Sequence, residues 1–529
     1  MARPAPRLRA AAALGLSWLA PLAWAGPVVE PIERPAPLVF AARDADGDGV
    51  RTLLKATPRI DVNERSADGT SALHWAIYHN DVPIIEVLLA AGADANARND
   101  YGSTPMSEAA VIGNVRVLRD LLAAHADVEA ANADGQTALM ILSRTNNLDA
   151  ARLLVTHHAN VNAREHWRGQ TPLMWAAAEG QAAMVQLLLA HGAQVDARSN
   201  VNEWQRQVTA EPRMQSRPSG GFTPLLYAAR RGCLDCARRL LEHGADKDLA
   251  DPDGVTPLLE AVLNFNFDVA RLLIERGADV NRWDYWGRAP LYAAVDLNTL
   301  PVGGRADRPS TDRTTCLSLI EQLLKASANP NLQLKLFPPY RSLRDDRGAD
   351  GLLTVGSTPL LRAAKAGDVP AMRLLLAHGA NPELPNTTGL TPLMAAAGNG
   401  SSPIDTRGRY KTEAQALAAL EALIAAGANV NARDTTGQTA LHGAAGWGFN
   451  SLVTSLAAHH ADLLVKDARG RTAADIAAGS ASSSGRASAE AHPETAALLR
   501  KLMERASLPP VAATSADDGT AGDPAGHAH

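Results

Sequence analysis

The stretch TPLLYAARRGCLDCARRLLEHGADKDLADPDGVTPLL, residues 223–259, decides how this chain folds. It opens with Thr223-Pro224, runs through two short apolar segments with helical spacing, and breaks at Gly244-Ala245-Asp246. The opening returns at Thr256-Pro257, 33 residues after its first occurrence. A period of this length indicates a repeated supersecondary unit.

The first residue of this unit recurs along most of the chain. Seven of the eleven intervals between neighbouring copies keep the same period to within one residue, and the phase is kept from the first copy to the last. Such a pattern indicates one repeat array instead of several unrelated domains. The twelve copies begin at Ala36, Ser71, Thr104, Thr137, Thr171, Thr223, Thr256, Ala289, Thr358, Thr391, Thr439 and Thr472.

The residue types of the unit favour a pair of short helices. Thr223 can cap a helix by accepting a backbone N–H, and Pro224 suits the first helical position, where no N–H is needed. Leu225 and Leu240 each belong to the apolar face of one helix, and Gly244 permits the left-handed conformation that ends a helix. One pair cannot bury its apolar face alone, so stability must come from stacking the copies.

The Thr-Pro-Leu-x-x-Ala-Ala opening at 223–229, the Gly-Ala-Asp break at 244–246 and the 33-residue period resemble the ankyrin repeat. The resemblance covers residues 36–505. It implies an all-α fold, an ankyrin-repeat solenoid of about twelve helix-turn-helix repeats with β-hairpin loops. It also implies a concave face, formed by hairpins and inner helices, that serves as a binding groove. It names no partner, because fold does not determine function.

Long insertions interrupt the period, and we expect them to raise both rims of the groove around copies five to ten. Loops that break a strict period are candidates for function. Tolerated surface growth is the alternative, because long loops cost little closure entropy. A disordered tail is predicted at 506–529. The insertions lie near 196–221, 299–314, 333–356, 401–412 and 479–491.

The beginning of the chain, residues 1–25, resembles a secretory signal peptide, with early arginines, an apolar run from 10 to 23 and the small-residue site Ala23-Trp24-Ala25. An uncleaved anchor is the alternative. Residues 26–35 are rich in proline and are predicted to form a linker. We expect an exported protein in the bacterial periplasm, or alternatively outside the cell, without membrane insertion after signal cleavage.

The charge of the chain argues against nucleic acid as a partner. The 529 residues carry a net charge of −5, which falls to −8 without the three arginines of the predicted signal. Nucleic-acid binding requires clustered Lys and Arg, which are not found here. We expect a monomer that binds another protein.

Five histidines share one position, just before the residue that ends the second helix of a copy. Successive copies should stack about 8–10 Å apart, whereas one zinc ion needs its nitrogen ligands at about 2.0–2.1 Å. We therefore interpret them as helix-ending residues, not as metal ligands. They are His157, His191, His243, His378 and His459.

Two further patterns suggest chemistry. Cys233 and Cys236 could form a disulfide or a redox pair, or could pack as small residues; Cys316 should lie too far away to join them. Residues 44–49, DADGDG, resemble the start of a calcium loop, but Lys55 stands where a carboxylate is needed, so we interpret them as a turn between helices. With no nucleophile motif or phosphate loop, we predict no enzyme, no cofactor and no metal.

Aromatic residues are only 4% of the chain, yet they gather at hairpin and groove-lining positions. Rings beside arginines are typical of interface hot spots. The alternative is that the rings fold beneath the long loops. Trp75 and Trp175 should pack between inner helices, and the insertions add Phe337 and Tyr340. The candidate partner-binding residues are Tyr78, Tyr101, Trp167, Trp204, Phe222, Arg230, Arg231, Trp283, Tyr285, Trp286, Arg288 and Trp447.

These features together predict a non-catalytic protein-protein interaction scaffold that binds its partner in a concave groove. Two alternatives remain open. Aromatic rings with polar neighbours also suit a glycan or cell-wall binding module, and an exported scaffold could be an effector secreted to a host cell.

Overall fold

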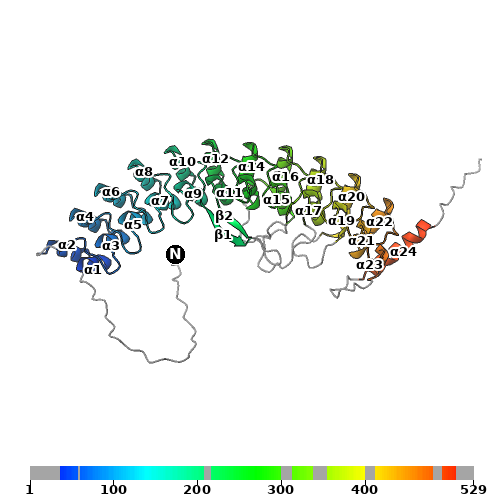
Figure 1. Ribbon diagram of the computed structural model, residues 1–529, viewed down its shortest axis with the longest axis horizontal. Coiled ribbons are helices and arrows are strands. Elements are labelled where there is room, and N and C mark those ends of the chain that lie inside the picture. The colour runs from blue at the N-terminus through cyan, green and yellow to red at the C-terminus, as the bar shows by residue number, and fades with distance from the viewer. Residues whose placement is uncertain are drawn as a thin grey trace, which may run out of the picture.

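A computed structural model describes residues 36–56, 60–207, 216–299, 312–336, 354–399, 411–479 and 491–507. Within them the chain forms 24 helices and one two-stranded sheet, and stacked helix pairs make a single arch (Figure 1). The prediction of an all-α repeat solenoid is confirmed. The expected leader and linker, the aromatic residues Phe337 and Tyr340, and the tail from residue 508 onward lie outside the described residues.

The odd-numbered helices line the concave side of the arch and the even-numbered helices form its outer layer (Figure 1). Each inner helix packs on the next inner helix and on its own outer helix. The inner helices are α1 (Pro37–Arg43), α3 (Ala72–Tyr78), α5 (Pro105–Ile112), α7 (Ala138–Thr145), α9 (Pro172–Glu179), α11 (Pro224–Arg231), α13 (Pro257–Leu263), α15 (Pro290–Asn298), α17 (Pro359–Ala366), α19 (Pro392–Ala397), α21 (Ala440–Gly446) and α23 (Ala473–Ala477). The outer helices are α2 (Gly47–Lys55), α4 (Val82–Ala90), α6 (Val115–Ala123), α8 (Leu148–Thr156), α10 (Ala182–Ala190), α12 (Leu234–Glu242), α14 (Phe267–Glu275), α16 (Cys316–Lys325), α18 (Val369–Ala377), α20 (Glu413–Ala425), α22 (Asn450–Ala458) and α24 (Pro493–Ser507).

The inner helices begin as their sequence predicts. The hydroxyl of Thr223 accepts the backbone N–H of Leu226 at 3.2 Å, and Pro224 takes the first helical position of α11. Gly232 ends α11 with a φ of +80°, in the left-handed region. Since the cap and the ending residue recur in most copies, the length of each inner helix is set locally, before any packing is considered.

A single hydrophobic core runs through the described repeats. Leu225 of α11 and Leu240 of α12 are fully buried, and the same cluster extends from Leu38 in the first repeat to Leu499 in α24. Burying a leucine completely contributes about 1.5–3 kcal/mol. Because each repeat buries its apolar face on its neighbours, this energy belongs to the stack and not to a single copy.

The two strands form a hairpin within the expected insertion at 196–221. β1 (Val201–Gln207) and β2 (Ser216–Gly220) pair antiparallel, with an irregularity between Asn202 and Arg206. The hairpin projects from the concave side of the arch, below α9 and α11 in Figure 1. Elsewhere in the described residues the loops between repeats are turns that form no further paired strands.

A ladder of side-chain hydrogen bonds links successive repeats through their turns. Asn96 Oδ1 accepts the backbone N–H of Asp127 at 2.7 Å, and Asn96 Nδ2 donates to the carbonyl of His125 at 3.1 Å. These atoms belong to the next repeat, so the amide fastens one turn to the following one. Five other asparagines make both bonds: Asn63, Asn162, Asn281, Asn331 and Asn431.

Candidate functional site

The concave side of the arch is built from one repeated face of the inner helices. We number the residues of each inner helix from its capping residue, which is position one. Positions five and eight are then about one helical turn apart and lie on the same face of the helix. In α3, Leu73, Ala76 and Ile77 at positions three, six and seven are buried, whereas Tyr78 at position eight is 61% exposed. Positions five and eight therefore face the groove.

At three places in the groove, position eight of one repeat contacts position five of the next. This diagonal relation joins α7 to α9, α11 to α13 and α15 to α17, so the groove floor continues from one repeat to another. The three pairs are Arg144 over the Trp175 ring (5.1 Å to the centroid), Arg230 Nε to Glu260 Oε1 (2.6 Å) and Arg362 Nε to Asp296 Oδ1 (2.5 Å).

The groove differs between its two halves. Around α11 to α17 the diagonal pairs are ion pairs, and the side chains of Glu260 and Arg362 are almost completely buried. Around α3 to α7 the same positions expose apolar groups: Tyr78, and Val111 of α5, which is 61% exposed. Trp75 is half-buried and packs edge-on to Tyr78, with ring centroids 5.7 Å apart.

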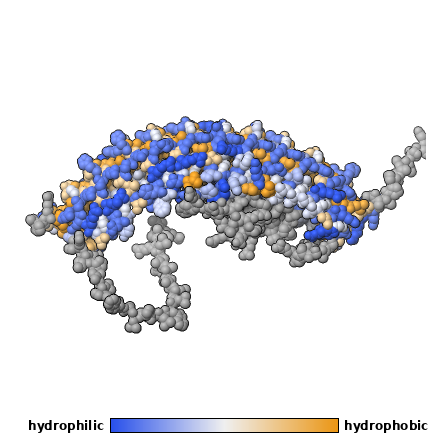
Figure 2. Space-filling model, viewed as in Figure 1, coloured by the Kyte–Doolittle hydropathy of each residue, from blue (hydrophilic) through white to orange (hydrophobic). Residues whose placement is uncertain are grey.

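The turns between repeats expose a second set of rings. Tyr101, Trp167, Trp283 and Tyr285 are all exposed, and Tyr101 is the most exposed of them at 71%. Trp167 Nε1 donates to Asp134 of the preceding turn at 3.1 Å, which holds its ring against the stack. The face of the molecule shown in Figure 2 is largely hydrophilic, with small separate hydrophobic patches.

Trp283 borders an open depression of about 680 Å³ between the turns that precede α15, α17 and α19. The ammonium group of Lys335 lies 3.6 Å from the centroid of the Trp283 ring. The amides lining the depression already serve the turns: Gln333 Nε2 donates to the carbonyls of Gly356 and Pro385. The depression therefore offers one aromatic edge and few free hydrogen-bonding groups.

Comparison with models of protein families shows which family these repeats match. A model of ankyrin repeats in three copies matches residues 38–132, 106–199, 203–284 and 313–404, and a model of the single ankyrin repeat matches 388–435. The chain belongs to the ankyrin-repeat family. Ankyrin repeats generally mediate protein–protein interaction, and the proteins built from them are generally non-catalytic scaffolds. A search of curated proteins found no match to this chain.

The ankyrin stack uses several of the predicted partner-binding residues for its own structure. Trp286 is only 2% exposed, so the expectation of an exposed ring is wrong for it: the ring packs edge-on to Tyr285, at 5.4 Å between centroids, beside the Arg288 guanidinium. Arg288 is itself mostly buried in an ion pair with Asp284 at 2.7 Å. These two side chains hold the turn and do not extend from it.

Phe222 and Trp447 are also less available than expected. Phe222 is buried beneath Arg230, whose guanidinium carbon lies 4.0 Å from the ring centroid. Trp447 is half-buried, and its Nε1 donates to the carbonyl of Gly398 at 2.9 Å, which closes the end of α19. Trp204 lies in β1, but its side chain is outside the described residues. Arg230 and Arg231 are exposed, as predicted.

The histidines have the structural roles expected of them. In each of the five copies the ring Nδ1 lies 2.8–2.9 Å from the backbone carbonyl four residues earlier, at the end of an outer helix. His74 and His442 occupy the histidine position of the ankyrin TPLH motif and bond to the cap residues Ser71 and Thr439. Within the described residues no three His, Cys, Asp or Glu side chains gather as metal ligands would.

Cys233 and Cys236 form a disulfide across the first turn of α12. Cys233 is the capping residue, and its sulfur accepts the backbone N–H of Cys236 at 3.1 Å. Cys236 is fully buried in the core, as predicted for a small apolar residue. Cys316 is a free thiol; burial raises its pKa to about 12, and the nearby carboxylates of Asp368 and Asp296 act in the same direction.

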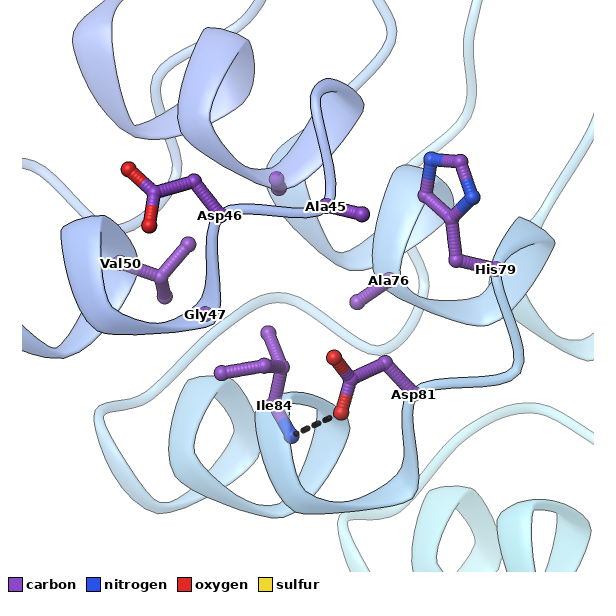
Figure 3. A pocket seen from close by; sticks show the side chains of 9 residues that line it. Ala45, Asp46, Gly47, Val50, Ala76, His79, Asp81 and Ile84 are labelled. Atoms are coloured by element: carbon purple, nitrogen blue, oxygen red, sulfur yellow. Dashed lines mark hydrogen bonds between the residues drawn. The ribbon is translucent and has the colours of Figure 1, made fainter.

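The aspartate-rich stretch of the first repeat forms the turn between α1 and α2, as predicted, together with the first residues of α2. Asp46 caps α2 by accepting the backbone N–H of Gly49 at 2.8 Å, and Asp81 caps α4 in the same way through Ile84 (Figure 3). The pocket between these two turns holds about 10 Å³, room for about one water molecule. Both carboxylates serve as helix caps, and this structural role accounts for the aspartates without a bound ligand.

One lysine has a strongly shifted pKa. Burial lowers the pKa of Lys411 to about 7, and the positive charge of Lys365 lowers it further. Its Nζ donates to the carbonyl of Ala395 in α19, so the amine is already engaged in closing the end of that helix. This geometry assigns Lys411 a structural role.

Proposed function

We propose that this ankyrin-repeat protein is a non-catalytic scaffold that binds another protein on its concave side. The observation that carries the proposal is the row of exposed side chains at position eight of α3, α5, α7 and α11, beside half-buried rings at position five of α3 and α9 and continued by exposed rings at the turns. Partner-facing rings at discrete points, surrounded by a hydrophilic surface, are typical of protein–protein hot spots.

The stack supports binding by holding these groups in place before a partner arrives. Diagonal pairs fix the groove floor, and the asparagine ladder fixes the turns that carry Tyr101 and Trp167. Ordering of flexible loops and side chains is one of the main costs of association. A rigid arch avoids much of that cost, so modest contact areas can give useful affinity.

We also propose that the chain is exported and acts in the periplasm. The sequence features of the predicted signal, residues 1–25, support this location, as does the Cys233–Cys236 disulfide, since disulfides persist in oxidising compartments. Among the described residues no helix is both long and apolar enough to cross a membrane. Fractionation of the producing cells, with amino-terminal sequencing of the mature chain, tests this proposal.

Glycan or cell-wall binding is the second candidate, and the geometry favours it less. A sugar would need an open ring face with free hydrogen-bonding groups around it. At Trp283 the ammonium group of Lys335 covers the ring, and Gln333 is committed to backbone carbonyls. An effector role outside the cell would require the chain in the culture medium, which the same fractionation would detect.

Affinity capture from the exported fraction, with identification by mass spectrometry, tests the proposed function. We expect a protein to be retained by the wild-type chain and released by a variant with Tyr78→Ala, Tyr101→Ala and Trp167→Ala. The control carries Leu464→Ala, because Leu464 is equally exposed but lies on a turn of the last repeats. Retention of glycans without any protein would contradict the proposal.

A further inference from the structure

We propose that the groove between α3 and α11 binds a protein segment that presents apolar side chains three residues apart, with carboxylates beside them. This inference rests on the proposed function and adds the location of the site and the chemistry of the partner. It follows from three features of the groove: the exposed apolar groups, the arginines that form no ion pair with a described residue, and the spacing of the repeats.

The apolar part of the site is an unbroken series of groove positions. Tyr78 of α3, Val111 and Ile112 at the end of α5, and Ile141 of α7 are exposed or half-exposed on adjacent inner helices. Trp175 of α9 continues the series. Clustered exposed apolar groups rimmed by polar residues mark interaction sites, because leaving them in water is unfavourable.

Three exposed arginines belong to this part of the arch: Arg144 and Arg231 on the inner helices α7 and α11, and Arg168 in the turn before α9. Arg144, Arg168 and Arg231 are exposed, and none has a carboxylate within 4.0 Å in the described part of the chain. Arg144 lies over Trp175 from the α7 side. Arg231 reaches α9 from the α11 side, since a Cβ added at Gly180 would lie 3.7 Å from its Nε. Two guanidinium groups therefore approach α9 from both neighbours.

Few carboxylates on this face compete for those arginines. Glu108 of α5 accepts the hydroxyl of Ser103 at 2.5 Å, and Glu179 lies at the end of α9. In the other half of the groove the chain supplies its own carboxylates, as in the Arg230–Glu260 pair. A carboxylate of the partner would form an ion pair with the arginines of the first half, as Glu260 does with Arg230. Guanidinium–carboxylate pairs combine charge with two-point hydrogen bonding, so they select acidic partners.

The spacing of the repeats sets the spacing of the partner side chains. Neighbouring helices pack about 8–10 Å apart, and a segment in the polyproline II conformation rises about 3.1 Å per residue with three residues per turn, which places residues i and i+3 on one face about 9 Å apart. Apolar side chains that meet successive inner helices should therefore stand three residues apart. Acidic residues between or beside them would reach Arg144 and Arg231.

Selection from a library of random dodecapeptides displayed on phage tests this inference with the full chain immobilised. We expect enrichment of peptides that carry apolar residues at i and i+3 together with Asp or Glu. A fluorescent synthetic copy of the best peptide should bind at least tenfold more weakly to Val111→Glu. Arg144→Glu with Arg231→Glu should also weaken it tenfold, and replacing the peptide's acids by Lys should restore binding to that variant.

The controls separate this inference from the proposed function. Leu464→Glu places the same charge on an exposed apolar residue outside the groove and should leave peptide affinity unchanged. Thermal unfolding of every variant checks that these exposed substitutions preserve the fold. Enrichment of basic or uncharged peptides would overturn the proposed partner chemistry. Binding lost with Trp283→Ala and unaffected by Val111→Glu would overturn the location, while a protein-binding function would stand. Absence of any enriched peptide, with no protein captured from extract, would overturn both.

Discussion

Asp251 and Asp467 occupy the same turn position in two repeats, and only Asp467 has an arginine four residues later. Each carboxylate accepts two backbone N–H groups of its own turn at 2.9 Å. Arg471 adds an ion pair to Asp467 at 2.7 Å, whereas Val255 stands at the matching place after Asp251. Burial raises the pKa of Asp251 to about 6. Burial also opposes ionisation of Asp467, but hydrogen bonds from Arg471 outweigh it and lower its pKa.

We predict that Asp251→Asn stabilises the protein at neutral pH. The amide oxygen can accept the same two N–H groups, as Asn132 does at the equivalent position of another repeat. Because the folded-state pKa of Asp251 lies above the unfolded value, folding favours the protonated acid. Its contribution is fully present below about pH 4 and is lost as the pH rises through about 6.

Urea unfolding from pH 4 to pH 8 measures this effect. Asp251→Asn should raise the free energy of unfolding at pH 7.5 by about 1–2 kcal/mol, a value reduced for partial exposure of the group. The matched variant Asp467→Asn should instead lower it by about 1.5–3 kcal/mol, because it breaks a charged hydrogen bond to Arg471. Equal effects of the two substitutions would show that Arg471 does not distinguish the two sites.

The asparagine ladder gives a second prediction. Asn96→Ala removes an acceptor and a donor that join two turns, and it should lower the free energy of unfolding by about 1–2 kcal/mol. Asn96→Asp keeps the acceptor alone, as Asp248 does naturally when it accepts the N–H of Asp279 at 2.8 Å. It should therefore cost about half as much. Hydrogen exchange at the amide of Asp127 reports this bond directly and should accelerate in Asn96→Ala, with unchanged exchange at Asp279.

The repeat frame could be predicted from sequence because its signals are local. The Thr223-Pro224 opening, the ending glycine and the regular period act within one copy, and the structure places helices as they indicate. The ladder could not be recognised, since Asn96 resembles any solvated turn residue until the next turn is placed beside it. The diagonal pairs, such as Arg230 with Glu260, were detectable in principle, because their separation in sequence equals one period less one helical turn.

Burial of single aromatic residues lay beyond sequence patterns. Trp283, Tyr285 and Trp286 are close neighbours in one turn, yet the first two are exposed and the third is buried. The difference arises from a segment much later in the chain, where the backbone N–H of Lys335 donates to the carbonyl of Trp286 at 2.9 Å. Contacts between a turn and the following repeat depend on the lengths of the loops between them. The insertion expected at 299–314 lies between Trp286 and Lys335 in the sequence.

The Cys233–Cys236 disulfide gives a third prediction. It spans one helical turn, so opening it releases little chain entropy, and we expect reduction to lower the free energy of unfolding by about 1–2 kcal/mol. The reduced Cys233 sulfur can still cap α12 by accepting the N–H of Cys236. Thermal unfolding with and without dithiothreitol measures the change. Cys233→Ser with Cys236→Ala, which keeps a capping oxygen, should match the reduced protein and lose its response to the reductant; a response that persists would point to Cys316.

Trp283 and Trp286 provide the last prediction, because neighbouring rings should have opposite roles. Trp286→Ala removes a ring that is 2% exposed, and large-to-small changes of this kind cost about 3–5 kcal/mol. Trp283→Ala removes a ring that stands at the surface beneath Lys335, and it should change the free energy of unfolding by less than about 1 kcal/mol. Denaturant unfolding of the two variants, compared under identical conditions, tests the difference. If Trp283→Ala proved as destabilising as Trp286→Ala, the Trp283 ring would be part of the structural core of the turn and would not be available to a partner.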